Sequence, residues 1–293
     1  MHFETLKDKC EYFRSLTDYK LTPNSYVIAM LDGRSFSKLI KNKYKKPFDE
    51  TFISIMNEVA EYLVKNIQGA KFAYTQSDEI SILITDFDTP ETDAAFGYRI
   101  CKLQSILAAM AASKFNQLAF LKDVEPRLYK NCLEDCEGRT IYNAEEVLKE
   151  YKDQRLVEFD CKVWSVPDYN TAFCHFLWRQ NDCIRNSKQQ AAQTYLSHKE
   201  LIGKQTDEQV ELLLQEKGID WNNYSDGEKY GRIIYKERRL FKNYSIDNET
   251  AGIDGVSVTA MVEKKYIRNV WTSHPADSFG DENSIIKTLI PQR

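Results

Sequence analysis

The chain has 293 residues, of which 42% are hydrophobic and 29% charged, and its formal net charge is −4. These values are typical of a globular protein with a sizeable core, and they exclude polyanion binding through overall charge, so RNA would need local basic patches. No stretch approaches the ~20 apolar residues of a membrane span, and the polar N-terminus is unlike a secretory leader. The seven cysteines are odd in number and scattered, so we expect reduced thiols and a cytoplasmic protein.

The N-terminal part begins with a helix, a strand and a second helix. Residues 3–18 carry apolar side chains at helical spacing, which predicts an amphipathic helix. The continuous apolar run 26–31 is typical of a buried strand. Asp49 is placed to cap a helix whose apolar stripe extends from 52 to 64.

Two strands, a long helix and a further strand follow. The strand patterns lie at 70–75 and 79–85, and Ser77-Asp78 fits the two-residue loop of a hairpin. A helical pattern spans 91–115, and the next strand pattern spans 156–166. The order β-α-β-β-α-β is the split βαβ arrangement of ferredoxin-like folds and polymerase palms. We therefore predict an α+β fold, with an antiparallel sheet packed on helices.

The remaining segments are predicted to be additions to this core. Residues 123–154 are polar and charge-rich and look like an insertion. Helical patterns at 168–197 and 206–217, the second capped by Thr206, precede short strands and loops from residue 226 onward. The predicted units are a palm-like catalytic core, 1–167, and a helical and mixed C-terminal region packed on it, 168–293.

Two acidic clusters lie where this order brings strand ends together. Asp32 and Gly33 close the first strand, and Asp78 and Glu79 follow a tight turn. A lone aspartate at a strand end is more often a turn residue, so the pair carries the prediction. Two carboxylates there form an oxygen-rich site for Mg²⁺, suited to phosphoryl or nucleotidyl transfer. Glu79 begins a strand and points away from Asp78, so we expect a lesser role for it.

Neighbouring segments offer contacts to phosphate. The loop after the first strand enters a helix, and free backbone N–H groups at such a place bind triphosphates. Lys46 ends a basic run that leads back toward the metal site, whereas Arg99 and Lys102 share one helix face and could clamp phosphate. Each feature also has an ordinary interpretation, as a turn, a solvated surface or the charged edge of an amphipathic helix.

Other catalytic chemistries find little support. Cys132 and Cys136 form a lone Cys-x₃-Cys with no second ligand pair nearby, so a structural zinc site is not expected. The four histidines form no metal-spaced pair, and no Ser-His-Asp signature is present. A hydrolase is therefore disfavoured.

Taken together, these motifs resemble the tRNA-His guanylyltransferase superfamily, whose members add nucleotides in the 3′-to-5′ direction. The resemblance covers about 5–235, broken by 123–154. The matching motifs are Leu-Asp-Gly-Arg-Ser-Phe (31–36), Lys46-Pro47 with Asp49, Tyr-Thr-Gln-Ser-Asp-Glu (74–79), Arg99-x₂-Lys102, Phe159-Asp160-x-Lys162, and Trp178-Arg179-Gln180 followed by Asp182-Cys183.

The resemblance implies a nucleotidyltransferase with a palm-like fold, commonly a homotetramer. Asp32, the Gly33 carbonyl and Asp78 would bind two Mg²⁺ ions, and Glu79 would support catalysis. ATP and GTP would be substrates. The implied nucleotide-binding residues are Asp32, Gly33, Arg34, Ser35, Phe36, Ser37, Lys46, Asp49, Ser77, Asp78, Arg99 and Lys102. The implied RNA contacts are Arg179, Arg185 and Asn186.

The family activates a 5′-monophosphate on tRNA with ATP, after which the 3′-hydroxyl of a nucleoside triphosphate attacks and AMP leaves. In the tRNA-His-specific branch, Asp-Cys is followed by His-Ile-Asn-Asn, which is linked to anticodon recognition. Here the matching stretch is Ile-Arg-Asn-Ser (184–187), and Ser37 and Phe48 also depart from that branch. The chain is thus more similar to the guanylyltransferase-like branch, which repairs truncated 5′ ends against a template strand.

We therefore predict template-dependent 3′-to-5′ addition to the 5′ end of tRNA. Two alternatives stay open at this point. One is non-templated addition of a single G to tRNA-His, and the other is a non-catalytic palm-fold module that binds nucleotides or RNA.

Overall fold

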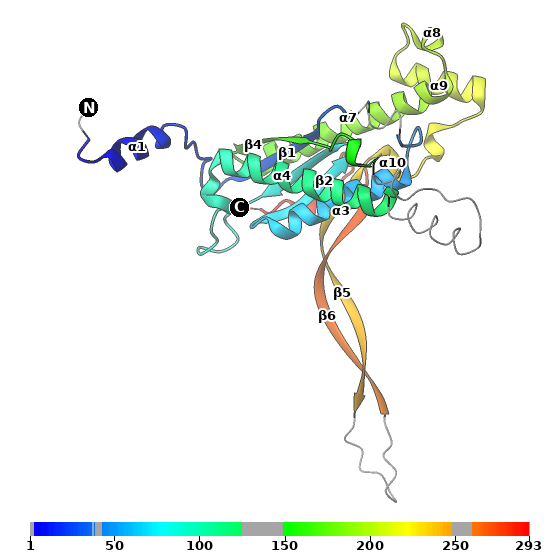
Figure 1. Ribbon diagram of the computed structural model, residues 1–293. Helices are drawn as coiled ribbons and strands as arrows, with labels where there is room; N and C mark the ends of the chain where they lie inside the picture. Colours follow the sequence, from blue (N-terminus) through cyan, green and yellow to red (C-terminus); the bar gives the residue numbers. More distant parts are fainter. Residues whose placement is uncertain are drawn as a thin grey trace, which may run out of the picture.

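The computed structural model describes residues 3–36, 38, 43–124, 149, 151–247 and 260–292 (Figure 1). Within these residues, a six-stranded antiparallel sheet has the order β4-β1-β3-β2-β5-β6. Its strands are β1 (Tyr26–Gly33), β2 (Ala70–Gln76), β3 (Glu79–Ile84), β4 (Phe159–Val166), β5 (Arg232–Asp247) and β6 (Ala260–Pro275). The first four have the order of a split βαβ fold, so the predicted α+β palm-like core is confirmed.

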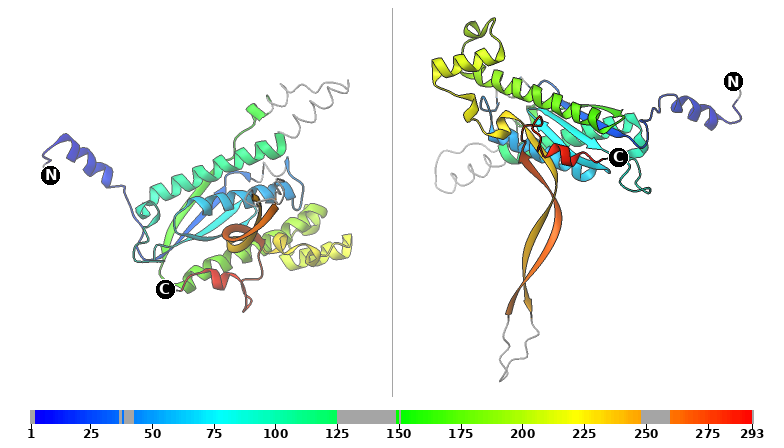
Figure 2. Two further views of the ribbon diagram at one scale, coloured as in Figure 1. Left: turned by 90° about the horizontal axis from the view of Figure 1, so that it is seen from below. Right: turned by 180° about the vertical axis from the view of Figure 1, so that it is seen from behind.

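Two long helices cover one face of the sheet, α3 (Glu50–Asn66) and α4 (Ile100–Ala119) (Figure 2). Alternate side chains of β1, such as Val27 and Leu31, point to these helices and are fully buried. The N–H of Phe52 donates to Asp49 Oδ1 over 2.8 Å, so Asp49 caps α3 as predicted. This layer fixes the direction of β1 and therefore the position of its end.

The opposite face packs against α7 (Tyr169–Tyr195), which Asp168 caps. Ile28 of β1 and Leu83 of β3 meet Phe176 there in a second buried cluster. The C-terminal half of α7 extends past the sheet and carries a third cluster around Leu213 and Trp221. The other helices of this region are α8 (His198–Leu201), α9 (Thr206–Lys217), α10 (Asp226–Lys229) and α11 (Ile286–Leu289).

A long two-stranded arm leaves the sheet (Figure 1). β5 and β6 pair continuously, from Arg232↔Pro275 to Asp247↔Ala260. Only the first residues of β5, up to Tyr235, pair with β2 and extend the sheet. The predicted short strands and loops from residue 226 are therefore wrong, because strands without a core behind them lack the alternating apolar pattern that identifies a strand.

Two helix boundaries differ from the predictions. The helix predicted over 91–115 begins only at Ile100, because Phe96, Gly97 and Tyr98 take positive φ angles of 52°, 59° and 53°. The cap of α9 is formed by Gln205, whose N–H donates to Glu208 over 2.7 Å, and not by Thr206. Both changes come from local backbone geometry that apolar spacing does not reveal.

The N-terminal helix α1 (Leu6–Ser15) forms as predicted but buries none of its residues, and Leu6 is 78% exposed. Most of the predicted insertion at 123–154, with Cys132 and Cys136, lies outside the described residues. The predicted division at 167 stays a prediction, although the sheet continues across it through β5. Among the described helices, none is long and apolar enough to cross a membrane.

Candidate active site

A tight turn joins β2 to β3 and carries Asp78. Gln76 and Glu79 are paired across it, and the Thr75 hydroxyl donates to the Glu79 carbonyl over 2.9 Å. Ser77 has a φ of 46°, a left-handed conformation that costs energy for a residue other than glycine. Its hydroxyl donates to Asp78 Oδ1 over 2.9 Å. The two-residue loop predicted here is confirmed, and it presents Asp78 at a strand tip.

The two aspartates that we expected to meet lie on adjacent strand ends. Asp32 is directly paired with Glu79 across β1 and β3, and the Gly33 N–H donates to the Asp78 carbonyl over 3.2 Å. Burial and, to a smaller extent, the charge of Asp32 raise the pKa of Asp78 to about 6. An aspartate with so high a pKa in the free protein gains from a nearby cation, because the cation favours its charged form.

A further carboxylate, missed by sequence reasoning, joins this row. Asp160 of β4 is paired with Asp32, and both lie on the α7 face of the sheet together with Glu79. Burial and the charge of Asp160 raise the pKa of Asp32, whereas Lys162 and Arg179 lower it. The motif around Asp160 was visible in the sequence, but β4 is far from β1 along the chain, and only the strand order brings them together.

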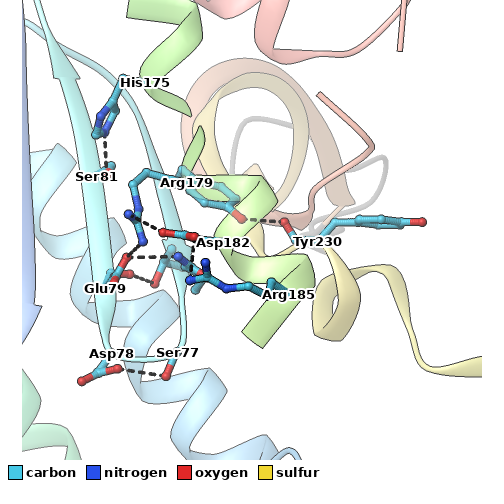
Figure 3. A network of polar contacts seen from close by, with 12 residues as sticks. Ser77, Asp78, Glu79, Ser81, His175, Arg179, Asp182, Arg185 and Tyr230 are labelled. Atoms are coloured by element: carbon cyan, nitrogen blue, oxygen red, sulfur yellow. Dashed lines mark hydrogen bonds and ion pairs between the residues drawn. The ribbon is translucent and has the colours of Figure 1, made fainter. Parts of the chain in front are cut away.

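Glu79 is held by a chain of ion pairs (Figure 3). Its Oε2 accepts hydrogen bonds from Arg179 Nη2 over 2.7 Å and from Gln76 Nε2 over 3.0 Å. Arg179 Nη1 lies 2.9 Å from Asp182 Oδ2, and Arg185 Nη2 lies 2.8 Å from Asp182 Oδ1. Arg179 is thus buried, with 5% of its surface exposed, whereas the side chain of Arg185 is 57% exposed. The RNA contacts predicted for both stay predictions.

The loop after β1 is anchored by an aromatic side chain. A Cβ atom at Gly33 would lie 2.2 Å from Phe36 Cδ2, so only glycine fits above this ring. Phe36 is buried and contacts the rings of Phe52, Phe115 and Phe159. The Phe36 side chain therefore anchors the loop to the core. Any contact of this residue with a nucleotide would be made by its backbone. Ser37, predicted with it, lies outside the described residues.

The flanks of this loop carry Arg34, Ser35 and Lys46. Arg34 Nη1 lies 2.9 Å from Glu158 Oε2, and Ser35 has a φ of 63°. Lys46 is exposed next to Pro47. The nucleotide contacts predicted for these residues stay predictions, but all of them lie at the end of the sheet that carries the carboxylates.

A hollow adjoins the turn that carries Ser77 and Asp78. Its wall includes Ser77 of the turn, Phe48 and Asp49 before α3, and Asn186 of α7. Asp49 itself uses both oxygens within the protein, because Oδ2 accepts the Lys45 N–H over 2.9 Å while Oδ1 caps α3. Of the predicted nucleotide and RNA contacts, Ser77, Asp49 and Asn186 therefore share one hollow beside the carboxylates.

Arg99 and Lys102 are not brought to the carboxylates within one chain. They begin α4, beside residues 19–21, where Ile100 N–H donates to the Tyr19 carbonyl over 2.9 Å. That end of the sheet is where β1 begins, opposite to the end that carries Asp32. Arg99 Nε lies 2.5 Å from Asp18 Oδ1 instead. Within one chain, Arg99 and Lys102 therefore do not reach a nucleotide held at Asp32. Such a contact would require the α4 helix of a second copy of the chain.

The donor set fits Mg²⁺ that shares its ligands with a substrate. In the described ranges, no three acidic, histidine or cysteine side chains form a closed metal cluster. Asp32, Asp78 and the Gly33 carbonyl supply hard oxygen donors, and Mg²⁺ commonly takes one or two carboxylates and completes its shell with phosphate oxygens and water. The residues present therefore fit an ion that arrives with a nucleotide better than one held in a protein cage.

Comparison with known proteins assigns the chain to a family. The tRNAHis guanylyltransferase family matches residues 7–167, more than half of the sequence. The chain belongs to this family. It is therefore a nucleotidyltransferase of the tRNAHis guanylyltransferase family, and the resemblance read from its motifs is confirmed.

Relatives and solved structures agree with this membership. A tRNA(His) guanylyltransferase of Debaryomyces hansenii is 26% identical over 79% of this chain and 81% of its own length. An uncharacterised protein of Acanthamoeba polyphaga mimivirus is 28% identical over 84% of this chain and 81% of its own. A bacterial tRNA(His) guanylyltransferase-like protein in complex with ATP superimposes with a TM-score of 0.74 and 26% identity, covering 99% of this chain and 100% of that one.

Proposed function

We propose that this chain adds nucleotides in the 3′-to-5′ direction to the 5′ end of tRNA, and that base pairing with the opposite strand selects each nucleotide. The observation that carries the activity is the pair Asp32 and Asp78 on neighbouring strand tips of a palm-like sheet. Membership of the tRNAHis guanylyltransferase family supports the same chemistry. The likeness to a guanylyltransferase-like protein in complex with ATP supports ATP as a substrate.

The residues divide the work between metal and nucleotide. Asp32, Asp78 and the Gly33 carbonyl would hold Mg²⁺, which when bound neutralises phosphate charge and activates an attacking oxygen. The backbone of the loop that follows Gly33 would bind triphosphate, with Lys46 beside it. The carboxylates are held rigidly by the sheet, so they orient the reacting groups without further ordering.

The reaction is a pair of displacements at phosphorus. The 5′-phosphate of the RNA attacks the α-phosphorus of ATP, and pyrophosphate leaves. The 3′-hydroxyl of an incoming nucleoside triphosphate then attacks the RNA 5′-phosphorus, losing its proton, and AMP leaves. When the RNA already bears a 5′-triphosphate, pyrophosphate is the leaving group and activation is unnecessary.

Template use is favoured by the stretch Ile-Arg-Asn-Ser at 184–187 of α7. It stands where the tRNA-His-specific branch has His-Ile-Asn-Asn. Of this stretch, Asn186 lines the cavity beside Ser77, and Arg185 is exposed. With that histidine absent, Watson–Crick pairing, and not a side chain, would choose the nucleotide.

The basic side chains of the β5–β6 arm support RNA as the polymer to which nucleotides are added. Its described segments 236–242 and 265–271 carry six lysine and arginine residues and one glutamate, on a chain whose overall charge is negative. Phe241 and Tyr266 stack there with centroids 5.7 Å apart. A basic, aromatic surface of this kind suits a phosphate backbone, whose neutralisation releases bound counterions.

The decisive experiment uses one labelled tRNA that lacks its first nucleotide. It is incubated with the protein, Mg²⁺, ATP and all four nucleoside triphosphates, and the base opposite the gap is varied. A product that follows the opposing base supports the proposal. Addition of G whatever the opposing base, lost when the anticodon is changed, would support the non-templated reaction. No extension of any tRNA, with nucleotide binding intact, would support a binding module.

A further inference from the structure

We propose that Arg179 and Asp182 of α7 are positioning residues that hold Glu79 in place beside the catalytic turn. The inference rests on the proposed nucleotidyl transfer and deepens it, because it assigns Arg179 a role other than the RNA contact predicted from sequence. The observation behind it is the chain of ion pairs that runs from the surface of α7 to β3 (Figure 3).

The geometry of Arg179 makes it a bridge between two acidic groups. One terminal nitrogen, Nη2, lies 2.7 Å from Glu79 Oε2, and the other, Nη1, lies 2.9 Å from Asp182 Oδ2. The guanidinium also lies over the Trp178 ring, 4.3 Å from its centroid. A planar guanidinium that forms ion pairs through both terminal nitrogens and packs on an aromatic ring with one face is held in a single orientation.

Burial separates this arginine from an RNA contact. Only 5% of Arg179 is exposed, and both terminal nitrogens are occupied by carboxylates. To contact a phosphate, it would have to leave the largely buried Glu79 without a cationic partner and Asp182 paired only with the exposed Arg185, which is unfavourable. Arg185, at the outer end of the same chain, is the residue that solvent reaches.

The Glu79 carboxylate is fixed through one oxygen only. In the described part of the chain, its two side-chain donors, Arg179 Nη2 and Gln76 Nε2, both reach Oε2. Glu79 adjoins Asp78 in the turn and is paired with Asp32 across the strands. The Glu79 carboxylate therefore lies next to the pair of aspartates, and the charge of Arg179 lowers the pKa of both Glu79 and Asp32, opposing the repulsion between them. A loosened bridge would let Glu79 rotate and would disturb the preorganised site.

Two conservative variants test this. Arg179→Lys keeps the positive charge but cannot bind both carboxylates with a planar fork, and Asp182→Asn keeps the shape but removes the charge. Steady-state kinetics on the truncated tRNA should show kcat lowered about 10- to 100-fold, with KM for tRNA and for nucleotide changed less than about 3-fold. The matched control is Asp207→Asn, which removes the 2.6 Å pair with Lys188 on the same helix from an 84% exposed aspartate. We expect it to behave as wild type.

An RNA contact predicts the reverse pattern. KM for tRNA would rise, kcat would be kept, and the dependence of tRNA affinity on salt would become weaker. That result, or unchanged kcat in both variants when their thermal unfolding shows them folded, would overturn the inference.

A readout without turnover separates this inference from the proposed function. In a double-mutant cycle on urea unfolding, Glu79→Gln and Asp182→Asn should be coupled, although their side chains touch only through Arg179. If the two substitutions are coupled but the wild-type protein extends no tRNA, the proposed function is contradicted and the ion-pair bridge through Arg179 is supported. If the effects of Glu79→Gln and Asp182→Asn on the free energy of unfolding are strictly additive, the bridge through Arg179 is contradicted, whatever the activity.

Discussion

The sheet carries two regions of opposite character, the carboxylate edge and the arm. At the carboxylate edge, formed by Asp32, Asp78, Glu79 and Asp160, negative side chains gather on a scaffold packed on both faces, and the first three are half-buried. Along the arm, positive side chains gather on two strands with no core behind them, and most are exposed. The first arrangement suits chemistry that needs fixed positions, and the second suits a long, flexible polyanion.

Both regions place like charges directly opposite each other. Asp32 faces Asp160 across β1 and β4, and Arg239 faces Arg268 across β5 and β6. Such pairs destabilise a sheet in the absence of a ligand. Counter-charges in the protein offset part of this repulsion: Lys162 and Arg179 lie near Asp32, and Glu237 Oε1 lies 2.5 Å from Arg239 Nε. The proposed cation at the carboxylate edge and the proposed polyanion at the arm would each reduce it further.

The largest effect is expected at the carboxylate edge. Asp78→Asn removes a charged donor while keeping the shape of the turn, and we expect nucleotide addition to fall by about 10³-fold or more. The matched control is Asp88→Asn, which removes a half-exposed carboxylate paired with Lys71, beyond the opposite end of β3. Extension assays on truncated tRNA measure both. An Asp78→Asn variant with more than a tenth of wild-type activity would contradict the assignment.

The interior behind the carboxylate edge should respond to acid. His175 of α7 is buried against Ser81, 3.1 Å from its hydroxyl, and burial, with help from Arg179, lowers its pKa to about 4. The unfolded chain takes up this proton near pH 6.5, so the contribution of neutral His175 to the free energy of unfolding is complete above that pH and is lost as the pH falls toward 4. The loss should be on the order of 3 kcal/mol.

Urea unfolding between pH 4.5 and 7 measures this loss. His175→Gln should remove the part of the pH dependence that destabilises the protein in acid. The raised pKa of Asp78, about 6, contributes with the opposite sign and should remain. His198→Gln, at an exposed histidine that starts α8, should keep the wild-type dependence. If the free energy of unfolding depends on pH equally in wild type and in His175→Gln, a group other than His175 causes the loss of stability in acid. The arm lacks a buried titrating group of this kind in its described residues, so arm variants should leave the slope unchanged.

The arm should show the smallest effect on the rate and a clear effect on affinity. The double variant Arg238→Ala/Arg268→Ala removes two exposed cations, and we expect tRNA affinity to fall about 10-fold at moderate salt, with a salt dependence weaker by about one unit per lost phosphate contact. Filter binding over a salt series measures both. Lys65→Ala, which removes a helix-surface lysine paired with Glu61, is the matched control. Unchanged affinity in the double variant would remove the arm from the RNA surface.

Sequence reasoning reached those parts of the molecule that depend on local patterns. The cap at Asp49, the buried strand that ends at Asp32 and the loop at Ser77 each depend on residues within one or two turns of chain. The split βαβ order then places Asp32 and Asp78 side by side, because that topology leaves few other arrangements.

The features that the sequence did not predict depend on contacts between residues far apart along the chain. The ion pair between Arg179 and Glu79 was not predicted, because β3 is a hundred residues away along the chain and only the tertiary fold brings Glu79 to α7. Arg99 lies at the far end of the sheet because α4 begins beside residues 19–21, which precede β1, and this placement depends on tertiary contacts that helical spacing does not show. Beyond Tyr235, the described residues of the arm have no buried side chain, and the periodicity that identifies a strand records burial and not hydrogen bonding.

β5 belongs to both regions at once. Its first residues are hydrogen-bonded to β2, with Arg232 paired to Thr75 just before the Ser77-Asp78 turn, and the same uninterrupted strand continues into the arm. At about 3.3 Å per residue, roughly 40 Å of strand lies beyond that ladder. An RNA bound to the outer described residues of the arm, as proposed, would therefore be connected through one continuous strand to β2, which ends at Gln76 beside the Ser77-Asp78 turn.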